Sequence, residues 1–394
     1  MSYSKDEESR ALKKFLVYLS AFGDTFCSFV QSGLVATGDG GNNNSLTIAS
    51  HGQPHLKLTD DTVKVLCTGI LECGMTLASL TLKFHSISDV GASVIGNLVT
   101  SPTVGLRYLD LEGNDISTPS VLGISNSKLE LLNLSSNPIG EKGGMELATF
   151  VQNNNNLTFL GVSCCDLNLK ASIGLITSLH DNTRLGVLHM DKPLLNFSKQ
   201  EETTDHLSRV LLDKTSGLRE LSMKNHTFGD RGARLLSDAL SRNEVLTRIN
   251  LDSNKICDAG AEALASFLIL QQRQKVANPH LRRNYIDSIS LSHNNISDEG
   301  AISLAEAIRC NTSLKSVYLR GNVIGRAGLC AIAEAVYNNK NLEQLTLFGN
   351  SFEQTAGSMF YNVIKKYLPF RSTPLKLDID VYIVDGIYMI ADCQ

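Results

Sequence analysis

A unit of 28 residues recurs along this chain of 394 residues, and its internal pattern limits the fold more than any other feature does. One copy spans residues 314–341. Apolar and polar residues alternate around Val317 and Leu319, which is typical of a short buried strand. The second half then repeats every four residues, as one face of a helix does, at Gly328, Ile332 and Val336. Each unit therefore predicts a strand, a turn and a helix.

Ten copies begin at the same offset, and five of the nine intervals between them are 28 residues. The copies start at Leu77, Leu106, Leu129, Leu157, Leu185, Leu218, Leu246, Ile286, Leu314 and Leu342. A single unit cannot seal the wedge between its strand and its helix, so the units must stack. The sequence predicts an α/β fold, a curved solenoid of about ten to eleven repeats shaped like a horseshoe. Parallel strands are expected on its concave face and helices on its convex face.

The ninth position of the unit is an asparagine in six copies, namely Asn114, Asn137, Asn254, Asn294, Asn322 and Asn350. An asparagine side chain can satisfy backbone groups where the chain leaves the strand. Cys165 takes this position once, so we expect Cys165 inside the core and its neighbour Cys164 on the surface. The pattern LxxLxLxxN resembles the leucine-rich repeat, and the length of 28 residues resembles the ribonuclease-inhibitor type of that family.

Three regions are expected. Residues 1–55 contain an amphipathic helix and a Gly/Asn linker, and the helix either caps the first repeat or docks a partner. Residues 56–368 form the repeat array, in which Pro119 shortens or removes one helix and residues 271–285 form an inserted loop. Residues 369–394 form a strand and a β-hairpin cap, because Asp385 and Gly386 are a strong turn signal.

Composition excludes several functions. A net charge of −4 favours neither nucleic acid nor a membrane as partner, and no apolar run reaches transmembrane length. Nine cysteines without CxxC spacing and a charged, polar start predict an intracellular protein with reduced thiols. The motifs HExxH, GxSxG and the Walker loop are absent from the sequence. We therefore expect no enzyme activity, no catalytic residue, no metal, no cofactor and no small-molecule substrate.

Side chains between the inward leucines point out of the predicted concave face, and there we place a protein-interaction surface. Its core is a row of apolar residues in register, Tyr108, Leu131, Phe159 and Val187. Aromatic and arginine side chains dominate binding energy, so the same surface includes Lys192, Lys224, Arg248, Tyr318, Arg320 and Phe348. The insert is either a solvated loop or a docking site for an acidic partner, through Arg273, Lys275, Arg282 and Arg283.

Residues 191–210 and 381–391 resemble the family of leucine-rich repeat-containing protein 34. The resemblance implies a non-catalytic scaffold in the axoneme of a cilium or flagellum. Its partners would then be radial-spoke or other axonemal proteins, with the cytoplasm or nucleolus as alternative locations. An alternative function is the regulation of an enzyme, as a GTPase-activating protein or an inhibitor of the ribonuclease-inhibitor class. Arg320 or the pair Arg282 and Arg283 would then be the residues that act on the enzyme.

Overall fold

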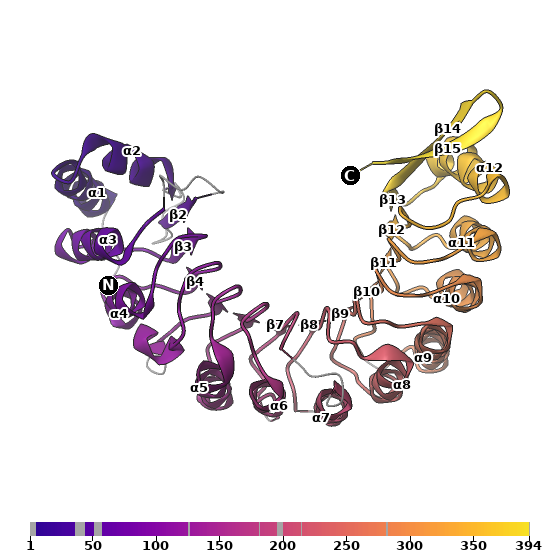
Figure 1. Cartoon of the computed structure of the whole chain (residues 1–394), viewed down its shortest axis with the longest axis horizontal. Coiled ribbons are helices and arrows are strands. Elements are labelled where there is room, and N and C mark those ends of the chain that lie inside the picture. The colour runs from indigo at the N-terminus through magenta and orange to yellow at the C-terminus, as the bar shows by residue number, and fades with distance from the viewer. Residues whose placement is uncertain are drawn as a thin grey trace. The chain divides into compact units, whose positions relative to one another are not determined.

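The structure is a computed structural model that describes residues 5–35, 44–50, 57–124, 127–180, 182–194, 200–213, 215–280 and 283–393. The chain divides into two compact units, residues 1–194 and 195–394. Within each unit, strands form a sheet whose one face is covered by the helices (Figure 1). The other face is open, and we call it the strand face of that unit. This arrangement confirms the predicted α/β leucine-rich-repeat architecture in both units.

The first unit contains six α-helices and seven strands among its described residues. The helices are α1 (Lys5–Ser20), α2 (Asp24–Ser32), α3 (Asp60–Glu72), α4 (Asp89–Thr100), α5 (Gly140–Asn153) and α6 (Leu169–Thr177). The strands are β1 (Leu34–Val35), β2 (Ser45–Ala49), β3 (Ser79–Lys83), β4 (Tyr108–Asp110), β5 (Leu131–Asn133), β6 (Phe159–Gly161) and β7 (Val187–His189). Strands β2 to β7 pair in parallel in chain order, and β1 is antiparallel to β2.

The second unit repeats the pattern and adds a hairpin. Its helices are α7 (Gln200–Leu212), α8 (Gly229–Leu240), α9 (Asp258–Ala277), α10 (Asp298–Cys310), α11 (Arg326–Asn338) and α12 (Gln354–Asn362). Its parallel strands are β8 (Glu220–Ser222), β9 (Arg248–Asn250), β10 (Ser288–Ser290), β11 (Ser316–Tyr318), β12 (Gln344–Thr346) and β13 (Lys376–Leu377). The antiparallel hairpin is formed by β14 (Ile379–Val384) and β15 (Ile387–Asp392).

Five of the six asparagines at the ninth position are buried, all but Asn350, and they satisfy backbone groups of two repeats at once. Asn322 Nδ2 donates to the carbonyl of Leu319 in its own repeat at 3.0 Å and to that of Leu291 in the preceding repeat at 2.9 Å. Its Oδ1 accepts from the backbone of Ile296 at 3.2 Å. The chain turns away from the strand at this point, so these bonds take the place of the backbone hydrogen bonds between strands, which have ended. The asparagines therefore satisfy backbone groups where the chain leaves the strand, as predicted, and they also join neighbouring repeats.

In two repeats that carry another residue at the ninth position, a different side chain bonds the backbone. The imidazole of His85 accepts from the backbone N–H of Leu58 at 3.2 Å, and its other nitrogen lies 3.2 Å from the carbonyl of Ile48. Cys165 is buried, and its thiol donates to the carbonyl of Leu134 at 3.1 Å. Burial raises the pKa of the Cys165 thiol to about 12, so the thiol is protonated at neutral pH. Cys164 is exposed, and both cysteines lie in the turn after β6 rather than in a strand.

Pro119 has the predicted effect on the repeat that starts at Leu106. A single 3-10 turn, Pro119–Leu122, stands where other repeats have an α-helix. The missing helix leaves a pocket beside α5 that is lined by Ser120, Ile124, Glu146, Thr149, Phe150, Asn153 and Asn154. The shortened repeat thus interrupts the helical layer of the first unit.

A row of aspartates, which the sequence pattern did not single out, connects the helices. Asp258, the first residue of α9, accepts from the backbone N–H groups of Ser297 at 2.7 Å and Gly300 at 2.9 Å, both at the start of α10. Asp60, Asp230 and Asp298 make the same two contacts with the next helix. A Cβ atom on Gly300 would lie 2.6 Å from the Asp258 carboxylate, so only glycine allows this approach. Each carboxylate therefore caps the helix of the following repeat.

We expect Asp258→Ala to lower the free energy of unfolding by about 1 to 2 kcal/mol at pH 7, the usual cost of a lost helix cap. Burial alone would raise the pKa of Asp258, but the hydrogen bonds from Ser297 and Gly300 outweigh it and hold the pKa below its ordinary value. The stabilisation is therefore complete above the unfolded pKa of about 4 and is lost as pH falls through the lower folded pKa. Urea titrations from pH 7 to pH 3 measure this. Exposed Glu262→Ala on the same helix is the control, and a loss at pH 3 as large as at pH 7 would contradict the assignment.

Candidate functional site: the strand face of the first unit

Four apolar side chains lie side by side on the strand face of the first unit. Tyr108, Leu131, Phe159 and Val187 are paired in register on the neighbouring strands β4 to β7. Each is half-buried, because the side chains of the adjacent strands cover its flanks. The Phe159 ring packs edge-on against His189 with the ring centres 5.1 Å apart. The Tyr108 hydroxyl donates to Glu130 at 3.1 Å. We call these four residues the apolar row.

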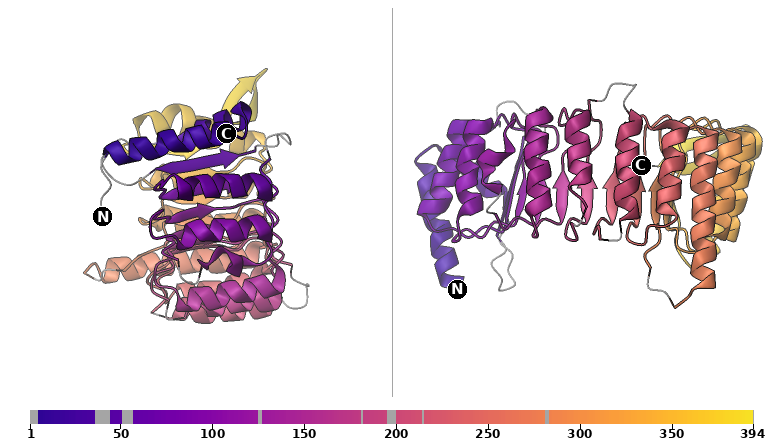
Figure 2. Two further views of the ribbon diagram at one scale, coloured as in Figure 1. Left: turned by 90° about the vertical axis from the view of Figure 1, so that its left-hand side faces the viewer. Right: turned by 90° about the horizontal axis from the view of Figure 1, so that it is seen from below.

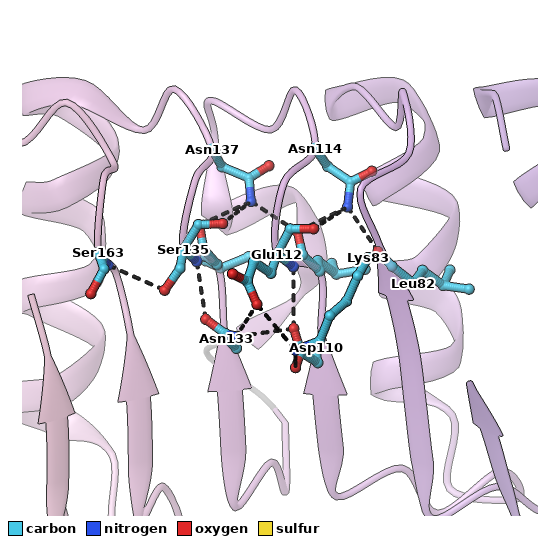
Figure 3. Close-up of polar contacts among 11 residues, drawn as sticks. Leu82, Lys83, Asp110, Glu112, Asn114, Asn133, Ser135, Asn137 and Ser163 are labelled. Atoms are coloured by element: carbon cyan, nitrogen blue, oxygen red, sulfur yellow. Dashed lines mark hydrogen bonds and ion pairs between the residues drawn. The ribbon is translucent and has the colours of Figure 1, made fainter. Parts of the chain in front are cut away.

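A polar band runs along the same face beside the apolar row, and Figure 3 shows the contacts of its members Lys83, Asp110, Glu112 and Asn133. We define the polar band as Lys83, Asp110, Glu112, Asn133 and Asp191. Lys83 Nζ lies 2.8 Å from Asp110 and 3.0 Å from Glu112. Burial alone would lower the pKa of Lys83, but its bonds to these two carboxylates raise it above its ordinary value. Asn133 Nδ2 donates to Asp110 at 3.0 Å. These contacts fix the side chains before any partner arrives.

Serines extend the polar band along the sheet. The backbone of Ser163 donates to the Ser135 hydroxyl at 3.2 Å, and the backbone of Asp191 donates to the Ser163 hydroxyl at 3.1 Å. Around Lys83 the band holds two carboxylates, those of Asp110 and Glu112, against one ammonium. Lys192 follows the band, and its side chain is exposed. The polar band is therefore ordered and carries net negative charge next to an apolar surface.

The strand face of the second unit has a different character. In the register position of the apolar row it carries Glu220, Arg248, Ser288, Ser316 and Gln344. Arg248 Nη1 lies 2.7 Å from Glu220, and Lys224 Nζ lies 3.8 Å from Asp252. The Tyr318 hydroxyl donates to Gln344 at 3.0 Å. The predicted residues Lys224, Arg248 and Tyr318 do lie on this face, but each already interacts with a neighbour within the unit.

Arg320 and Phe348, also predicted as interaction residues, hold the base of the hairpin. The Arg320 guanidinium lies 2.5 Å from Asp392 of β15 and 3.4 Å from Asp378, and its Cζ stands 4.9 Å from the centre of the Phe348 ring. Asp378 in turn accepts from the backbone of Leu347 at 2.6 Å. Sequence reasoning missed this cluster because Asp392 lies 72 residues beyond Arg320. Its contacts assign Arg320 a structural role within the second unit.

The insert after residue 270 differs from the prediction. Residues 271–277 are not loop but the end of α9, which extends beyond the neighbouring helices (Figure 2). Lys275 Nζ donates to the Ser313 hydroxyl at 2.7 Å, and Arg283 forms an ion pair with Glu244. The insert is therefore braced against the repeats on both sides, and Glu244 is an acidic partner that the local sequence did not reveal. Arg273 lies exposed on α9, and Arg282 lies outside the described residues.

Two features of the described residues bear on other classes of function. Among the residues that the structure describes, no group of three or more His, Cys, Asp or Glu side chains could hold a metal ion. No helix in that part of the chain is both long enough and apolar enough to cross a membrane.

Comparisons with known proteins agree with the repeat architecture. The family model described as "Leucine Rich repeat" matches residues 125–148, 242–265, 284–305 and 310–333. The chain is 27% identical over 253 residues to NACHT, LRR and PYD domains-containing protein 14 of Mus musculus, covering 58% of this chain and 25% of that protein. It is 29% identical over 174 residues to leucine-rich repeat-containing protein 34 of Mus musculus, covering 39% of this chain and 41% of that protein.

Ribonuclease inhibitor of Mus musculus is a further relative, 24% identical over 256 residues, which cover 63% of this chain and 53% of the inhibitor. The chain thus spans between a quarter and about half of the length of these three relatives. What they share with it is the repeat, whose period, buried asparagines and strand-turn-helix order are all present in the structure. The chain is therefore built from leucine-rich repeats, and they resemble those of the ribonuclease-inhibitor type.

Proposed function

We propose that the protein is a non-catalytic scaffold that binds another protein on the strand face of its first unit. The observation that carries this proposal is the apolar row Tyr108, Leu131, Phe159 and Val187, in register on four strands and only partly buried. Burying such a row against a partner removes apolar surface from water, and aromatic side chains contribute most to binding energy. The hydrogen bonds within the polar band already restrict its side chains, so the entropic cost of ordering them on binding is smaller.

The polar band gives the partner a chemical character. Asp110 and Glu112 present two carboxylates beside the apolar row, and the ammonium of Lys83 contacts both of them. A partner segment that places apolar side chains on the row and arginine or lysine beside it would satisfy both surfaces. We therefore propose a basic, amphipathic partner segment for this face.

The finer proposal is that the scaffold belongs to a large assembly such as the radial spoke of the ciliary axoneme. The support is the similarity to leucine-rich repeat-containing protein 34, which covers 39% of this chain, together with the resemblance of residues 191–210 and 381–391. A structural subunit buries much of one face in an obligate interface, which is consistent with an extended, preordered strand face.

The regulator of a GTPase or a nuclease is the weaker candidate. Such a regulator needs a polar side chain that can enter another protein's active site. Arg320 is bound by two aspartates and Arg283 by Glu244, so both would first have to leave an ion pair. This favours the scaffold over the regulator.

Crosslinking mass spectrometry on a lysate of ciliated cells tests the proposal. We expect crosslinks from Lys192, which is exposed at the edge of the polar band, to radial-spoke or other axonemal proteins. If crosslinks lead instead only to a soluble GTPase or a nuclease, the scaffold proposal fails and the regulator replaces it. A panel of small GTPases with and without the purified protein then shows whether hydrolysis is accelerated.

A further inference from the structure

The hairpin of β14 and β15 has two faces of different burial. Its register pairs Val381 with Ile390 and Ile383 with Tyr388 on one face, which we call the inner face. The opposite, outer face carries Tyr382, Val384, Ile387 and Met389, paired as Tyr382 with Met389 and Val384 with Ile387. These four outer side chains are between 43% and 51% exposed. The hairpin thus presents a continuous apolar surface to solvent.

Helix α12 covers the inner face. A Cβ atom on Gly357 would lie 2.8 Å from the Cβ of Tyr388, so the helix approaches the strand as closely as glycine permits. The rings of Tyr361 and Tyr388 lie 5.7 Å apart, and Val381 is fully buried. A hairpin of two strands is stable only marginally in water, and this helix supplies the packing that it needs. The inner face is therefore packed against α12 around Val381 and Tyr388, whereas Ile383 near the turn remains 48% exposed.

The free edge of β15 is also satisfied within the second unit. The backbone N–H of Tyr388 donates to Gln354 Oε1 at 2.8 Å, and Gln354 Nε2 donates to the Tyr388 carbonyl at 3.3 Å. The side-chain amide of Gln354 thus bonds both the N–H and the C=O of Tyr388, which a neighbouring strand would otherwise bond. Because the backbone groups of Tyr388 point away from β14, the pair Ile383 and Tyr388 is one of the pairs without mutual hydrogen bonds.

The free edge of β14 is open by the same geometry. The N–H and C=O of Ile383 must point away from β15, and β14 pairs with β15 alone among the described residues. Exposed edges usually carry lysine, proline or a bulge that prevents pairing. The sequence IDVYIV of β14 has none of these. Its one charged residue, Asp380, is bound to Lys365 at 2.7 Å and accepts from the backbone N–H of Val381 at 2.8 Å, so the open part of the edge lies at Ile383. Four of its six residues are β-branched and favour pairing.

From these contacts we infer that the edge of β14 is a second docking site, which accepts an extended segment of a partner protein as an added strand. Backbone groups of the segment would bond Ile383, and apolar residues at alternate positions would continue the outer face beside Tyr382 and Val384. Asp385 stands exposed at the turn, beyond the apolar stretch of β14. A basic residue at that end of the segment would meet its carboxylate. This site lies in the second unit and does not depend on the apolar row.

A second copy of the chain fits the outer face less well. Four side chains of this size, each about half exposed, offer roughly 400 Å², whereas a stable dimer buries about 800 Å² per partner. A single strand needs less area because the hydrogen bonds to the edge supply part of the affinity. The geometry thus favours one extended segment over a self-associated pair.

The test uses the full chain and a labelled synthetic peptide that alternates valine and threonine between two terminal lysines. Fluorescence anisotropy should show saturable binding below about 1 mM. A peptide with its alternate amides N-methylated should lose the binding, because it cannot bond the edge. A peptide that ends in glutamates should bind more weakly, and Asp385→Asn should abolish this preference. Without saturable binding of the lysine peptide, or with equal binding of the methylated one, the inference is overturned.

Matched substitutions on the outer face separate the possible occupants. Val384→Lys places a charge on the edge strand and should weaken peptide binding at least tenfold, while Ile387→Lys, its cross-strand neighbour on β15, should change binding less than about threefold. Both side chains are about half exposed, and circular dichroism checks that both variants fold. Equal losses would indicate docking across the face instead of at the edge. Sedimentation of the wild type as a dimer that Val384→Lys dissociates would identify a second copy as the occupant. Either result contradicts the inference.

Discussion

Asn294→Ala should lower the free energy of unfolding by about 3 kcal/mol or more, the largest effect that we expect from a single polar substitution. Asn294 Nδ2 donates to the carbonyls of Leu251 at 3.0 Å and Leu291 at 2.9 Å. Its Oδ1 accepts from the backbone of Asn254 at 2.9 Å and Ile256 at 3.0 Å. The substitution leaves these groups of two repeats buried without partners, and each orphan costs about 1 to 3 kcal/mol.

Urea unfolding followed by circular dichroism measures the loss, and hydrogen exchange locates it. In a repeat array each repeat is stabilised mainly by its neighbours, so exchange should increase around β9 and β10 before it increases elsewhere in the second unit. The adjacent Asn295 is exposed, and Asn295→Ala should change the free energy of unfolding by less than about 0.5 kcal/mol. A loss below about 1 kcal/mol for Asn294→Ala would mean that water replaces the side chain.

Phe159→Ala should weaken binding of the partner at least tenfold, which corresponds to about 1.4 kcal/mol. Phe159 lies between Leu131 and Val187 in the apolar row, where the surrounding residues exclude water from a bound partner. The side chain is half-buried, so a smaller loss of folding stability is expected as well, and calorimetric titration is done well below the unfolding temperature.

Tyr337→Ala is the matched control, because Tyr337 is an exposed aromatic residue on the helical layer of α11. It should leave the affinity within about twofold of the wild type. If Tyr337→Ala weakens binding and Phe159→Ala does not, the partner uses the helices and the strand face is not the binding site.

Local sequence patterns predicted the parts of the fold that depend on local chemistry. The positions of the buried asparagines, the helix lost at Pro119 and the turn at Asp385 each follow from a property of one residue type, and the structure confirms them. The aspartate caps could have been found in the same way. Asp258 and Asp298 each stand two residues before a glycine that must lie close to a neighbouring carboxylate, so the spacing D-x-G is their signal.

The remaining features depend on residues that are distant in the sequence. Arg320 meets Asp392 and Arg283 meets Glu244 only because stacking brings repeats together, and no local pattern contains these pairs. The error in the insert has a different cause. Residues 272–277 read QRQKVA, mostly good helix formers, so α9 continues through them, and the extra length of the repeat does not by itself indicate a loop.

Site-specific photo-crosslinking shows which face of the first unit contacts the partner. A photoreactive amino acid is placed at position 131, in the middle of the apolar row, or at position 142 on α5, in the same repeat but on the helical layer. Our account predicts partner adducts from position 131 and none from position 142 when the protein is irradiated in a lysate of ciliated cells. Adducts from position 142 without adducts from position 131 would contradict it, because the partner would then bind the helices.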